Sequence, residues 1–457
     1  MSYRGILRAA ERSRINIQPQ RRFSVVADLF NPTPEHAELR KLVRDFTARE
    51  VEPQAAQYNR DERFNRTLFN RVGELGLLGV SAPPECGGAG LDATAVAIVH
   101  EELSASDPAF CLSYLAHSLL FVNNLAVNGS PAQRERLLPR ACSGELLCGM
   151  AMSEVGAGTD VLGMTTRAVR EANGDYTLNG SKMWITNGAA DDTQLGDAFL
   201  LYARDAAPKD TKREFRGAEC GKSARHHPGS FLLMQPPTSS PHRPSRAATY
   251  SLFLVEKGAQ GFSLGHRIKD KCGMRASNTA ELVLESVRVP ASSVVGKPGS
   301  AVLSMMRNLE IERVGLAAMS LGIARRCIET MNTYAKERVA FGSPLNRHGQ
   351  IQRHIAASYA EFSAARAYVY NTARQMNLAK EGGRLDSDGV KLFAAPMATG
   401  VANRAIQVLG GSGYVGGNVV ERLWRDAKLL EIGGGTNESH ERNITKDLAK
   451  LQDMMPW

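Results

Sequence analysis

The run Asp175-Tyr-Thr-Leu-Asn-Gly-Ser-Lys-Met-Trp-Ile-Thr186 decides the fold class, because it has the β-rich composition of a strand. Two similar runs follow it, Ala198-Phe-Leu-Leu-Tyr-Ala203 and Tyr250-Ser-Leu-Phe-Leu-Val255, and Asn-Gly and Gly turns separate the runs. All three lie in the middle of the chain, between two regions with helical patterns. This segregation predicts an α+β protein rather than alternating βαβ units.

The helical regions extend outward from the strands in both directions. Residues 34–150 are predicted to be helical, and Pro83-Pro-Glu-Cys-Gly-Gly-Ala-Gly90 predicts a loop between two helices. The first helix is predicted from one apolar face, made by Leu39, Leu42, Val43 and Phe46. After Pro298 the helical period returns and continues nearly to the end. We therefore expect helices, then a small β domain, then helices.

Composition and charge limit the class of protein. The 457 residues are 43% hydrophobic, which is enough for two or three packed domains, and no run of 18 apolar residues predicts a membrane span. Seven cysteines without a CxxC pair indicate a reducing compartment. The net charge of +9 is concentrated in residues 1–24 and 205–246. The remainder is about neutral, which argues against a nucleic-acid-binding or membrane-binding face.

Two segments are set apart from the fold. Residues 1–27 have the arginines, serines and few acids of a mitochondrial targeting leader, and Arg21-Arg22-Phe23-Ser24 resembles a matrix-protease site. We expect a matrix protein, although an ordinary frayed terminus is the alternative. Residues 205–248 show little periodicity and form either a surface insertion or a gene-model artefact. Cys220 and the His226-His227 pair within this insert do not make a metal site, because further ligands are missing.

One glycine motif is misleading. Gly411-Ser-Gly-Tyr-Val-Gly416 matches the dinucleotide fingerprint GxGxxG, but Ala405-Ile-Gln-Val-Leu409 before it has a helical pattern. Because the fingerprint needs a preceding strand, we do not predict a Rossmann site there.

Seven stretches, in order and at similar separations, resemble the acyl-CoA dehydrogenase family. They are residues 151–160, 182–188, 273–279, 337–345, 407–414, 425–428 and 431–436. The resemblance covers residues 34 to about 450, with only the insert outside the pattern. It implies an acyl-CoA dehydrogenase-like fold that follows the leader (1–27). Its parts are an N-terminal helical domain (28–149), a middle β-barrel-like domain (150–296, with the insert 205–248) and a C-terminal four-helix bundle (297–457).

The resemblance also implies FAD as cofactor. One group of residues is expected around the isoalloxazine ring, with Trp184 packed against it and Thr186 bonded near its reactive nitrogen: Met150, Ala151, Met152, Ser153, Gly158, Thr159, Trp184, Ile185 and Thr186. A second group is expected at the rest of the dinucleotide: Arg338, Phe341, Gln350, Gln407, Val408, Leu409, Gly410 and Gly411. In the family, Arg338, Gln350 and the 407–411 turn come from a neighbouring subunit, which suggests a homotetramer. Thr436, Asn437 and Glu438 complete the expected FAD site.

The catalytic base is expected on a helix. Dehydrogenation of a thioester needs a carboxylate beside the α-carbon, with its pKa raised by a dry pocket. Many family members carry this glutamate directly before the final Gly-Thr, where this chain has Gly434. A smaller branch, which includes isovaleryl-CoA and long-chain dehydrogenases, supplies it from an earlier helix. Here Glu310 and Glu312 match that helix and point about 200° apart, so only one can face the flavin. Residue matching selects Glu312.

The expected substrate is an acyl-CoA with a short branched chain. Gly433 and Gly434 leave room for a 3-methyl branch, and the Gly434 N–H can polarise the thioester carbonyl. The residues expected to contact substrate are Thr159, Leu303, Glu310, Ile311, Arg313, Gly433, Gly434 and Gly435. The resemblance favours isovaleryl-CoA, with conversion to 3-methylcrotonyl-CoA in leucine catabolism, and electron-transferring flavoprotein as acceptor.

Three alternatives remain open at this point: a longer-chain dehydrogenase, a flavin-dependent acyl-CoA oxidase and a non-catalytic flavin-binding relative. Val155-Gly156 stands where isovaleryl enzymes often have Pro-Asn, which weakens the substrate assignment.

Overall fold

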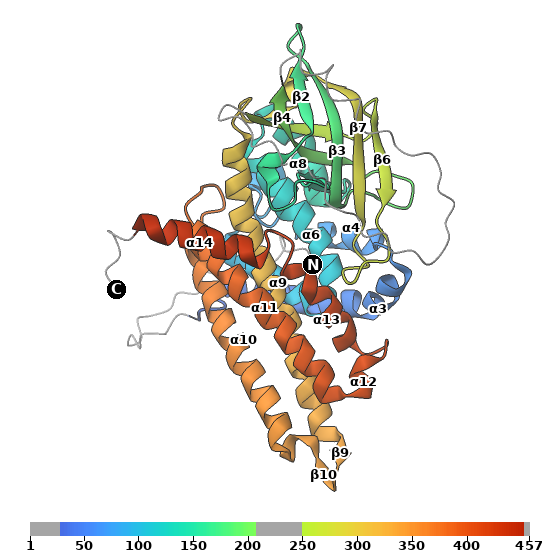
Figure 1. The fold of residues 1–457 in the computed structure, drawn as a ribbon, viewed down its shortest axis with the longest axis vertical. Coiled ribbons are helices and arrows are strands. Elements are labelled where there is room, and N and C mark those ends of the chain that lie inside the picture. The colour runs from blue at the N-terminus through green and yellow to red at the C-terminus, as the bar shows by residue number, and fades with distance from the viewer. Residues whose placement is uncertain (1–27, 207–248, 452–457) are drawn as a thin grey trace, which may run out of the picture.

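A computed structural model of the chain describes residues 28–206 and 249–451. Figure 1 shows N-terminal helices, a sheet and a C-terminal group of long helices. The predicted α+β segregation is therefore confirmed. The expected leader and residues 207–248 of the expected insert lie outside the described residues.

The N-terminal part is helical, as predicted, except that residues 148–150 of the predicted helical region lie in a strand, β1. It consists of α2 (Pro34–Phe46), η1 (Thr47–Val51), α3 (Glu52–Asp61), α4 (Arg66–Glu74), η2 (Pro84–Cys86), α5 (Ala93–Ser104), α6 (Pro108–Leu115), η3 (Ala116–Asn123), α7 (Asn124–Asn128) and α8 (Pro131–Ser143). Leu39, Val43 and Phe46 of the predicted apolar face are buried. The predicted loop at 83–90 connects α4 to α5 and contains a single 3-10 turn, η2.

The segment Pro108–Asn128, which comprises α6, η3 and α7, is long and apolar enough to cross a membrane. Most of it is buried among the other helices. In the described ranges it is the one helix with this property, and its packing is that of a core helix.

The middle part is one sheet of eight strands. They are β1 (Cys148–Ala151), β2 (Arg167–Arg170), β3 (Tyr176–Thr186), β4 (Ala198–Ala206), β5 (Tyr250–Glu256), β6 (Phe262–Arg267), β7 (Thr279–Val289) and β8 (Val294–Val295), with short 3-10 turns η4 (Val161–Gly163) and η6 (Ala291–Ser293). The strand order is β6-β7-β3-β2-β4-β5-β8, and β1 pairs with β4. The three predicted strands are β3, β4 and β5. Among the described strands β6 and β8 do not pair with each other, so the barrel-like domain is open.

Two Asn-Gly pairs near β3 have different structures. Asn173-Gly174 lies in the turn between β2 and β3, where the Gly174 N–H donates to the Glu171 carbonyl, and this confirms an Asn-Gly turn between strand runs. Asn179-Gly180 instead lies inside β3 at a shift of register. Gly180 has φ +145°, and a Cβ there would lie 2.6 Å from Thr166 Oγ1, so the bulge requires glycine.

The C-terminal part is built on long helices. Its elements are α9 (Ala301–Glu337), β9 (Val339–Ala340), β10 (Ser343–Pro344), η7 (Leu345–Arg347), α10 (Gly349–Gln375), α11 (Arg384–Leu409), α12 (Gly411–Tyr414), α13 (Val419–Leu430) and α14 (Asn437–Leu451). Helices α9, α10, α11 and α13 pack on one another, as expected of a four-helix bundle. Residues 405–409 lie in α11, so the helical prediction before the GxGxxG motif is confirmed.

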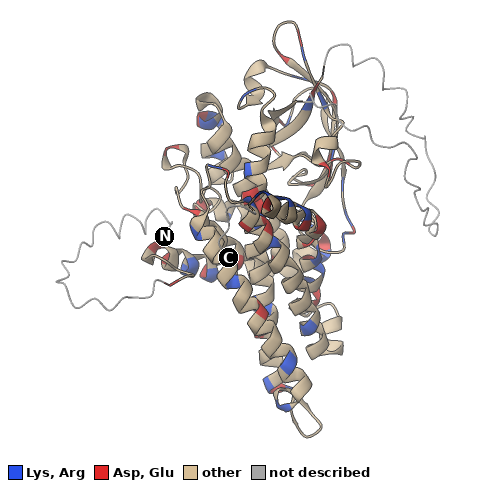
Figure 2. Cartoon of the chain, turned by 60° about the vertical axis from the view of Figure 1, so that its left-hand side comes forward, with Lys and Arg blue, Asp and Glu red and all other residues tan. Residues whose placement is uncertain are grey.

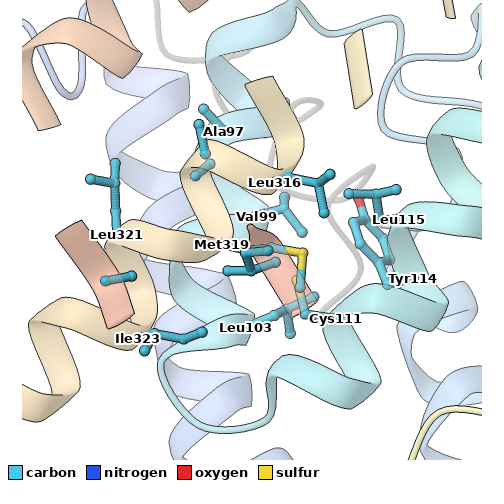
Figure 3. Packing of buried hydrophobic residues seen from close by; sticks show 14 of the residues in the cluster. Ala97, Val99, Leu103, Cys111, Tyr114, Leu115, Leu316, Met319, Leu321 and Ile323 are labelled. Atoms are coloured by element: carbon cyan, nitrogen blue, oxygen red, sulfur yellow. The ribbon is translucent and has the colours of Figure 1, made fainter. Parts of the chain in front are cut away.

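Helix α9 joins the three parts, because it packs on η3 and β5 near its beginning and on α5 farther along. Figure 3 shows Leu316, Met319 and Ile323 of α9 among residues of α5 and α6. At Gly322 a Cβ would lie 2.2 Å from Ser104 Oγ and 2.3 Å from the Glu101 carbonyl oxygen. Glycine at this position therefore permits the close approach of α5 and α9.

A buried charged network reinforces this contact. Arg40 of α2 donates to Glu101 (2.8 Å) and Glu102 (2.7 Å) of α5 and to the Tyr370 hydroxyl of α10 (2.6 Å). Arg325 of α9 donates to Glu102 at 2.7 Å. Figure 2 shows acidic and basic residues interspersed along the helices. The network thus links helices from both ends of the sequence.

We expect Arg40→Met to destabilise the protein by about 3 kcal/mol, because removal of one partner leaves buried carboxylates poorly compensated. Thermal and urea unfolding, compared with wild type, measure the effect. Arg63→Met, which breaks an exposed pair with Asp61, is the control and is expected to change stability little. Equal unfolding midpoints for Arg40→Met and wild type would contradict the prediction.

Candidate active site

Glu312 of α9 lies beside the glycine loop that connects α13 to α14. A Cβ at Gly434 would lie 3.5 Å from Glu312 Cδ and 3.6 Å from its Cγ. The carboxyl group on the helix therefore reaches the space beside position 434. Gly434 has φ +66° and Gly435 has φ +103°, so the loop has a backbone conformation that favours glycine.

The Glu312 carboxyl group has no partner among the described residues. Within residues 28–206 and 249–451 it forms neither a hydrogen bond nor an ion pair, and its side chain is half-buried. Burial raises the pKa of Glu312 to about 7, while Arg313 and Lys391 oppose this shift. A carboxylate with this pKa is a stronger base than an ordinary glutamate and is still substantially ionised near neutral pH.

Glu310 lies on the opposite side of α9, as the predicted 200° separation requires. It is buried, and its Oε2 accepts hydrogen bonds from the N–H groups of Gly382 (3.2 Å) and Gly383 (3.1 Å) in the loop before α11. Glu310 thus holds a loop, and Glu312 is the one of the two that remains available as a base.

Contacts connect Glu312 to the middle sheet. Asn308, one helical turn before Glu312, donates from Nδ2 to the sulfur of Met150 at 3.4 Å. The Met183 N–H donates to the Ser153 carbonyl at 2.9 Å, which places the loop after β1 beside Trp184. The structure therefore brings the predicted residues of the 150–153 segment and Trp184 to the side of α9 that carries Glu312.

Trp184 is turned out of the sheet. It has φ +60° next to a shift of register between Lys182 and Ile185, and its side chain is 52% exposed. Ile185 and Ala151 are instead buried in the sheet's core, so only their backbones are available to a ligand. An exposed indole held in a strained conformation fits a planar aromatic group such as a flavin.

A buried ion pair supports the loop after β1, and it was not predicted from the sequence. Lys182 Nζ donates to Glu154 at 2.9 Å and to the Met152 carbonyl at 3.0 Å, and Glu154 accepts from the N–H groups of Thr165 and Thr166. Burial opposes ionisation of Glu154, but Lys182 and the hydrogen bonds lower its pKa to about 2. The one feature of the sequence that could have indicated this ion pair is a lysine, Lys182, within a β-rich run. Gly158 and Thr159 of the supported loop are exposed.

The second group of predicted FAD residues lies elsewhere. Figure 1 shows β9, β10 and α12 at the end of the bundle away from the sheet. The following are exposed near that end: Arg338, Phe341, Gln350, Gln407, Gly410 and Gly411. Val408 and Leu409 have buried side chains. Arg338 follows Glu312 by 26 residues along α9, which is roughly 39 Å. One flavin therefore cannot touch both groups within a single chain.

The remaining predicted residues lie in different places. Thr436, Asn437 and Glu438 lie at the beginning of α14 beside the glycine loop, and Thr436 Oγ1 accepts from the Ser439 N–H at 3.3 Å. Leu303 is exposed near the beginning of α9, whereas Ile311 is packed in the core.

The structure also reveals a buried group of charges behind the glycine loop, of which only Arg313 was predicted, as a substrate contact. Arg313 is paired with Asp388 of α11 at 3.2 Å. Lys391 of α11 and His440 of α14 both contact the Gly435 carbonyl. In the sequence Asp388, Lys391 and His440 look like ordinary helical charges. In the part of the chain described, no group of three His, Cys, Asp or Glu side chains is arranged to hold a metal.

Comparisons with known proteins show the family to which the chain belongs. The acyl-CoA dehydrogenase N-terminal, middle and C-terminal domain models match residues 33–145, 149–220 and 302–449. The mitochondrial isovaleryl-CoA dehydrogenase of Arabidopsis thaliana is 37% identical over 424 residues, which are 92% of each chain. The chain belongs to the acyl-CoA dehydrogenase family, whose members are FAD-dependent oxidoreductases acting on the CH–CH group of acyl-CoA.

Two solved structures extend the comparison. The butyryl-CoA dehydrogenase of Megasphaera elsdenii has a TM-score of 0.77 and 28% identity, and the match covers 95% of this chain and 100% of that one. A glutaryl-CoA dehydrogenase from Mycobacterium smegmatis, in complex with FADH2, has a TM-score of 0.77 and 25% identity, with 92% and 95% covered. Both support the expected fold.

We expect Glu312→Gln to stabilise the protein increasingly as pH rises. The folded state keeps Glu312 protonated up to about pH 7, whereas the unfolded chain releases that proton near 4.5. The stability that Glu312 contributes is thus present below 4.5 and is lost as pH rises through 7, while Gln stays neutral. The gain at pH 8 is at most about 3 kcal/mol, and it is smaller to the extent that solvent reaches the half-buried side chain.

Unfolding midpoints at pH 5, 6, 7 and 8, with both proteins in the same cofactor state, measure this gain. Glu329→Gln, an exposed position on the same helix, is the matched control. A Glu312→Gln gain that does not change with pH would contradict the raised pKa.

Proposed function

We propose that this chain catalyses the FAD-dependent α,β-dehydrogenation of a short branched acyl-CoA, converting isovaleryl-CoA to 3-methylcrotonyl-CoA in leucine catabolism. The observation that carries the proposal is the unpaired Glu312 carboxyl group beside Gly434. It supplies a base and a backbone N–H at one place.

In the proposed reaction Glu312 removes the α-proton of the thioester, and the β-hydrogen leaves with its electron pair as hydride. The chemistry that bound FAD would supply is acceptance of this hydride. The Gly434 N–H donates to the thioester carbonyl, which stabilises the negative charge that develops as the proton leaves. The α,β double bond then forms, and the proton remains on the Glu312 carboxyl group. The raised pKa of Glu312 suits it to hold this proton.

Residues of two groups are proposed to hold FAD. Trp184 would pack on the ring, and Ser153, Thr186 and Thr436 would donate to it or to its chain. The exposed tip with Arg338 is proposed to reach the FAD of a second copy, since roughly 39 Å of helix separates it from Glu312. A homotetramer is the assembly proposed for this arrangement.

Three further parts of the proposal rest on the family and its relatives. The mitochondrial matrix is supported by the name of the Arabidopsis relative and by the leader-like sequence of residues 1–27. Electron-transferring flavoprotein is proposed as the acceptor of the flavin's electrons. The preference for a branched chain is supported by Gly433, where no atom lies closer than 3.5 Å to an added Cβ, and by the relative's substrate.

We expect isovaleryl-CoA to bleach the visible flavin absorbance of the purified protein without oxygen, faster than butyryl-CoA or palmitoyl-CoA. Glu312→Gln is expected to slow bleaching by about 10³-fold or more, because it removes the base. Stopped-flow absorbance measures both rates, and Glu329→Gln is the matched control on α9.

Other results of the bleaching experiment would favour one of the alternative functions or contradict the proposal. Preferential bleaching by palmitoyl-CoA would assign the chain to the longer-chain branch. Rapid reoxidation of the reduced protein by oxygen would make it an oxidase. A Glu312→Gln protein that bleaches as fast as wild type would eliminate Glu312 as the base, and no bleaching by any acyl-CoA would contradict the proposed activity.

A second prediction concerns specificity. Gly433 has no positive φ, and the nearest atom to an added Cβ is the Leu429 carbonyl oxygen at 3.5 Å, so a side chain is tolerated there. Gly433→Val is expected to lower kcat/KM for isovaleryl-CoA about tenfold relative to butyryl-CoA, because the β-branch loses its space. Gly433→Ala is expected to have a smaller effect in the same direction. Equal losses for both substrates would contradict this placement of the branch.

A further inference from the structure

A buried set of charged residues lies directly behind the glycine loop, and the proposed reaction does not yet use it. Asp388 and Lys391 of α11, Arg313 of α9 and His440 of α14 make up this set, which we call the loop support. Asp388 and His440 are fully buried, and Arg313 is 6% exposed. Charges buried to this degree are costly unless they are paired, so their arrangement is informative.

The loop support fixes the glycine loop at one oxygen. The Gly435 carbonyl accepts from Lys391 Nζ at 2.5 Å and from His440 Nε2 at 3.0 Å. Glycine loses more conformational freedom on folding than any other residue, and Gly433, Gly434 and Gly435 are consecutive. Two donors from two different helices therefore restrict a segment that has no side chains of its own.

His440 is itself held by Asp388. Its Nδ1 lies in hydrogen-bond contact with Asp388 Oδ1, while its Nε2 faces the Gly435 carbonyl. A carbonyl oxygen can only accept, so the Nε2 carries a proton. The other ring nitrogen faces the Asp388 carboxyl group, so the imidazole ring is held from both sides. Burial lowers the pKa of His440, and the bond to Asp388 opposes that shift.

Asp388 also controls the direction of Arg313. The same Oδ1 atom lies 3.2 Å from Arg313 Nη1, whereas no ion pair joins Arg313 to its neighbour Glu312 among the described residues. Consecutive helical residues point about 100° apart, so an arginine beside the base can either turn toward it or away. Asp388 keeps the guanidinium turned away, and Glu312 stays unpaired.

We propose that Asp388 and His440 are positioning residues for the dehydrogenation: His440 holds the Gly435 carbonyl so that the Gly434 N–H is aimed at the thioester, and Asp388 holds both His440 and Arg313. The catalytic consequence rests on the proposed function. The arrangement makes Glu312 a strong base, because its neighbouring cation is neutralised by another carboxylate rather than by Glu312.

The charged groups around Glu312, His440 and Arg313 determine how a substitution at Asp388 changes the pKa of Glu312. Glu312 is faced by Arg313 and Lys391, and His440 by Asp388, Lys391 and Arg313. Arg313 is faced in addition by Glu310 and Arg384. In Asp388→Asn, Arg313 loses its carboxylate partner and attracts Glu312, so the Glu312 pKa falls. The acid limb of the pH–rate profile should then move down by about one unit, and the plateau rate should fall about tenfold.

Variants at His440 should act differently. His440→Leu removes the donor to Gly435 and is expected to lower kcat about tenfold to a hundredfold with little change in KM, because the Gly434 N–H is misplaced. His440→Gln keeps one amide donor and should recover part of the loss. Asp447→Asn weakens a contact between Arg384 of α11 and α14 away from the loop and is expected to leave the rate unchanged.

Two measurements decide the proposal without substrate turnover. The infrared C=O band of protonated Glu312, assigned by its loss in Glu312→Gln, should titrate about one unit lower in Asp388→Asn than in wild type. Backbone hydrogen exchange in residues 431–437 should be faster in His440→Leu than in His440→Gln. If wild type is not bleached by any acyl-CoA, the proposed function fails, but these two measurements still test the support. An unchanged Glu312 titration and unchanged exchange would overturn the inference.

Discussion

The burial of helix α9 along most of its length is the constraint on which the rest of the structure depends. The helix spans Ala301–Glu337 and packs on the N-terminal helices, on the sheet and on the other helices of the bundle. Gly322 allows α5 to approach closely, and Arg325 ties α9 to the network around Glu102. Since a packed helix is nearly rigid, every residue on it has a fixed position relative to all three parts.

This rigidity explains why the proposed base on α9 and a glycine loop belong together. A Cβ at Gly434 would lie 2.3 Å from Leu316 Cδ1 and 3.5 Å from the Glu312 carboxyl carbon. Glu312, Leu316 and any side chain at position 434 therefore compete for one volume. A carboxylate at 434 would have to displace these α9 side chains, whereas a carboxylate at 312 needs only a glycine opposite it. The position of the proposed base and the absence of side chains in the loop are two consequences of one packing arrangement.

The sequence predicted those features that depend on local pattern. The strand runs, the apolar face of α2 and the helix before the GxGxxG motif follow from periodicity and turn residues, and all are confirmed. The 200° separation of Glu310 and Glu312 follows from helix geometry alone. The Lys182–Glu154 pair and the loop support could not be predicted, because each joins residues distant in sequence whose local patterns are ordinary. Strict alternation from buried Lys182 would place Trp184 on the buried face, but the shift of register between Lys182 and Ile185 turns it out instead.

The same helix also connects the chemistry to the proposed assembly. Arg338 directly follows α9, roughly 39 Å from Glu312, and beyond it Phe341 has a side chain that is 98% exposed. An aromatic side chain left in water gives up the stabilisation that burial would provide, of the order of 2 kcal/mol. A contact with a second copy would recover that stabilisation and would place the tip of one bundle beside the flavin residues of another chain. Because α9 is rigid, the position of each tip is then fixed relative to the base on its own chain. Assembly and catalysis would thus share one structural element, and a disturbance in the middle of α9 would affect the flavin sites of two subunits.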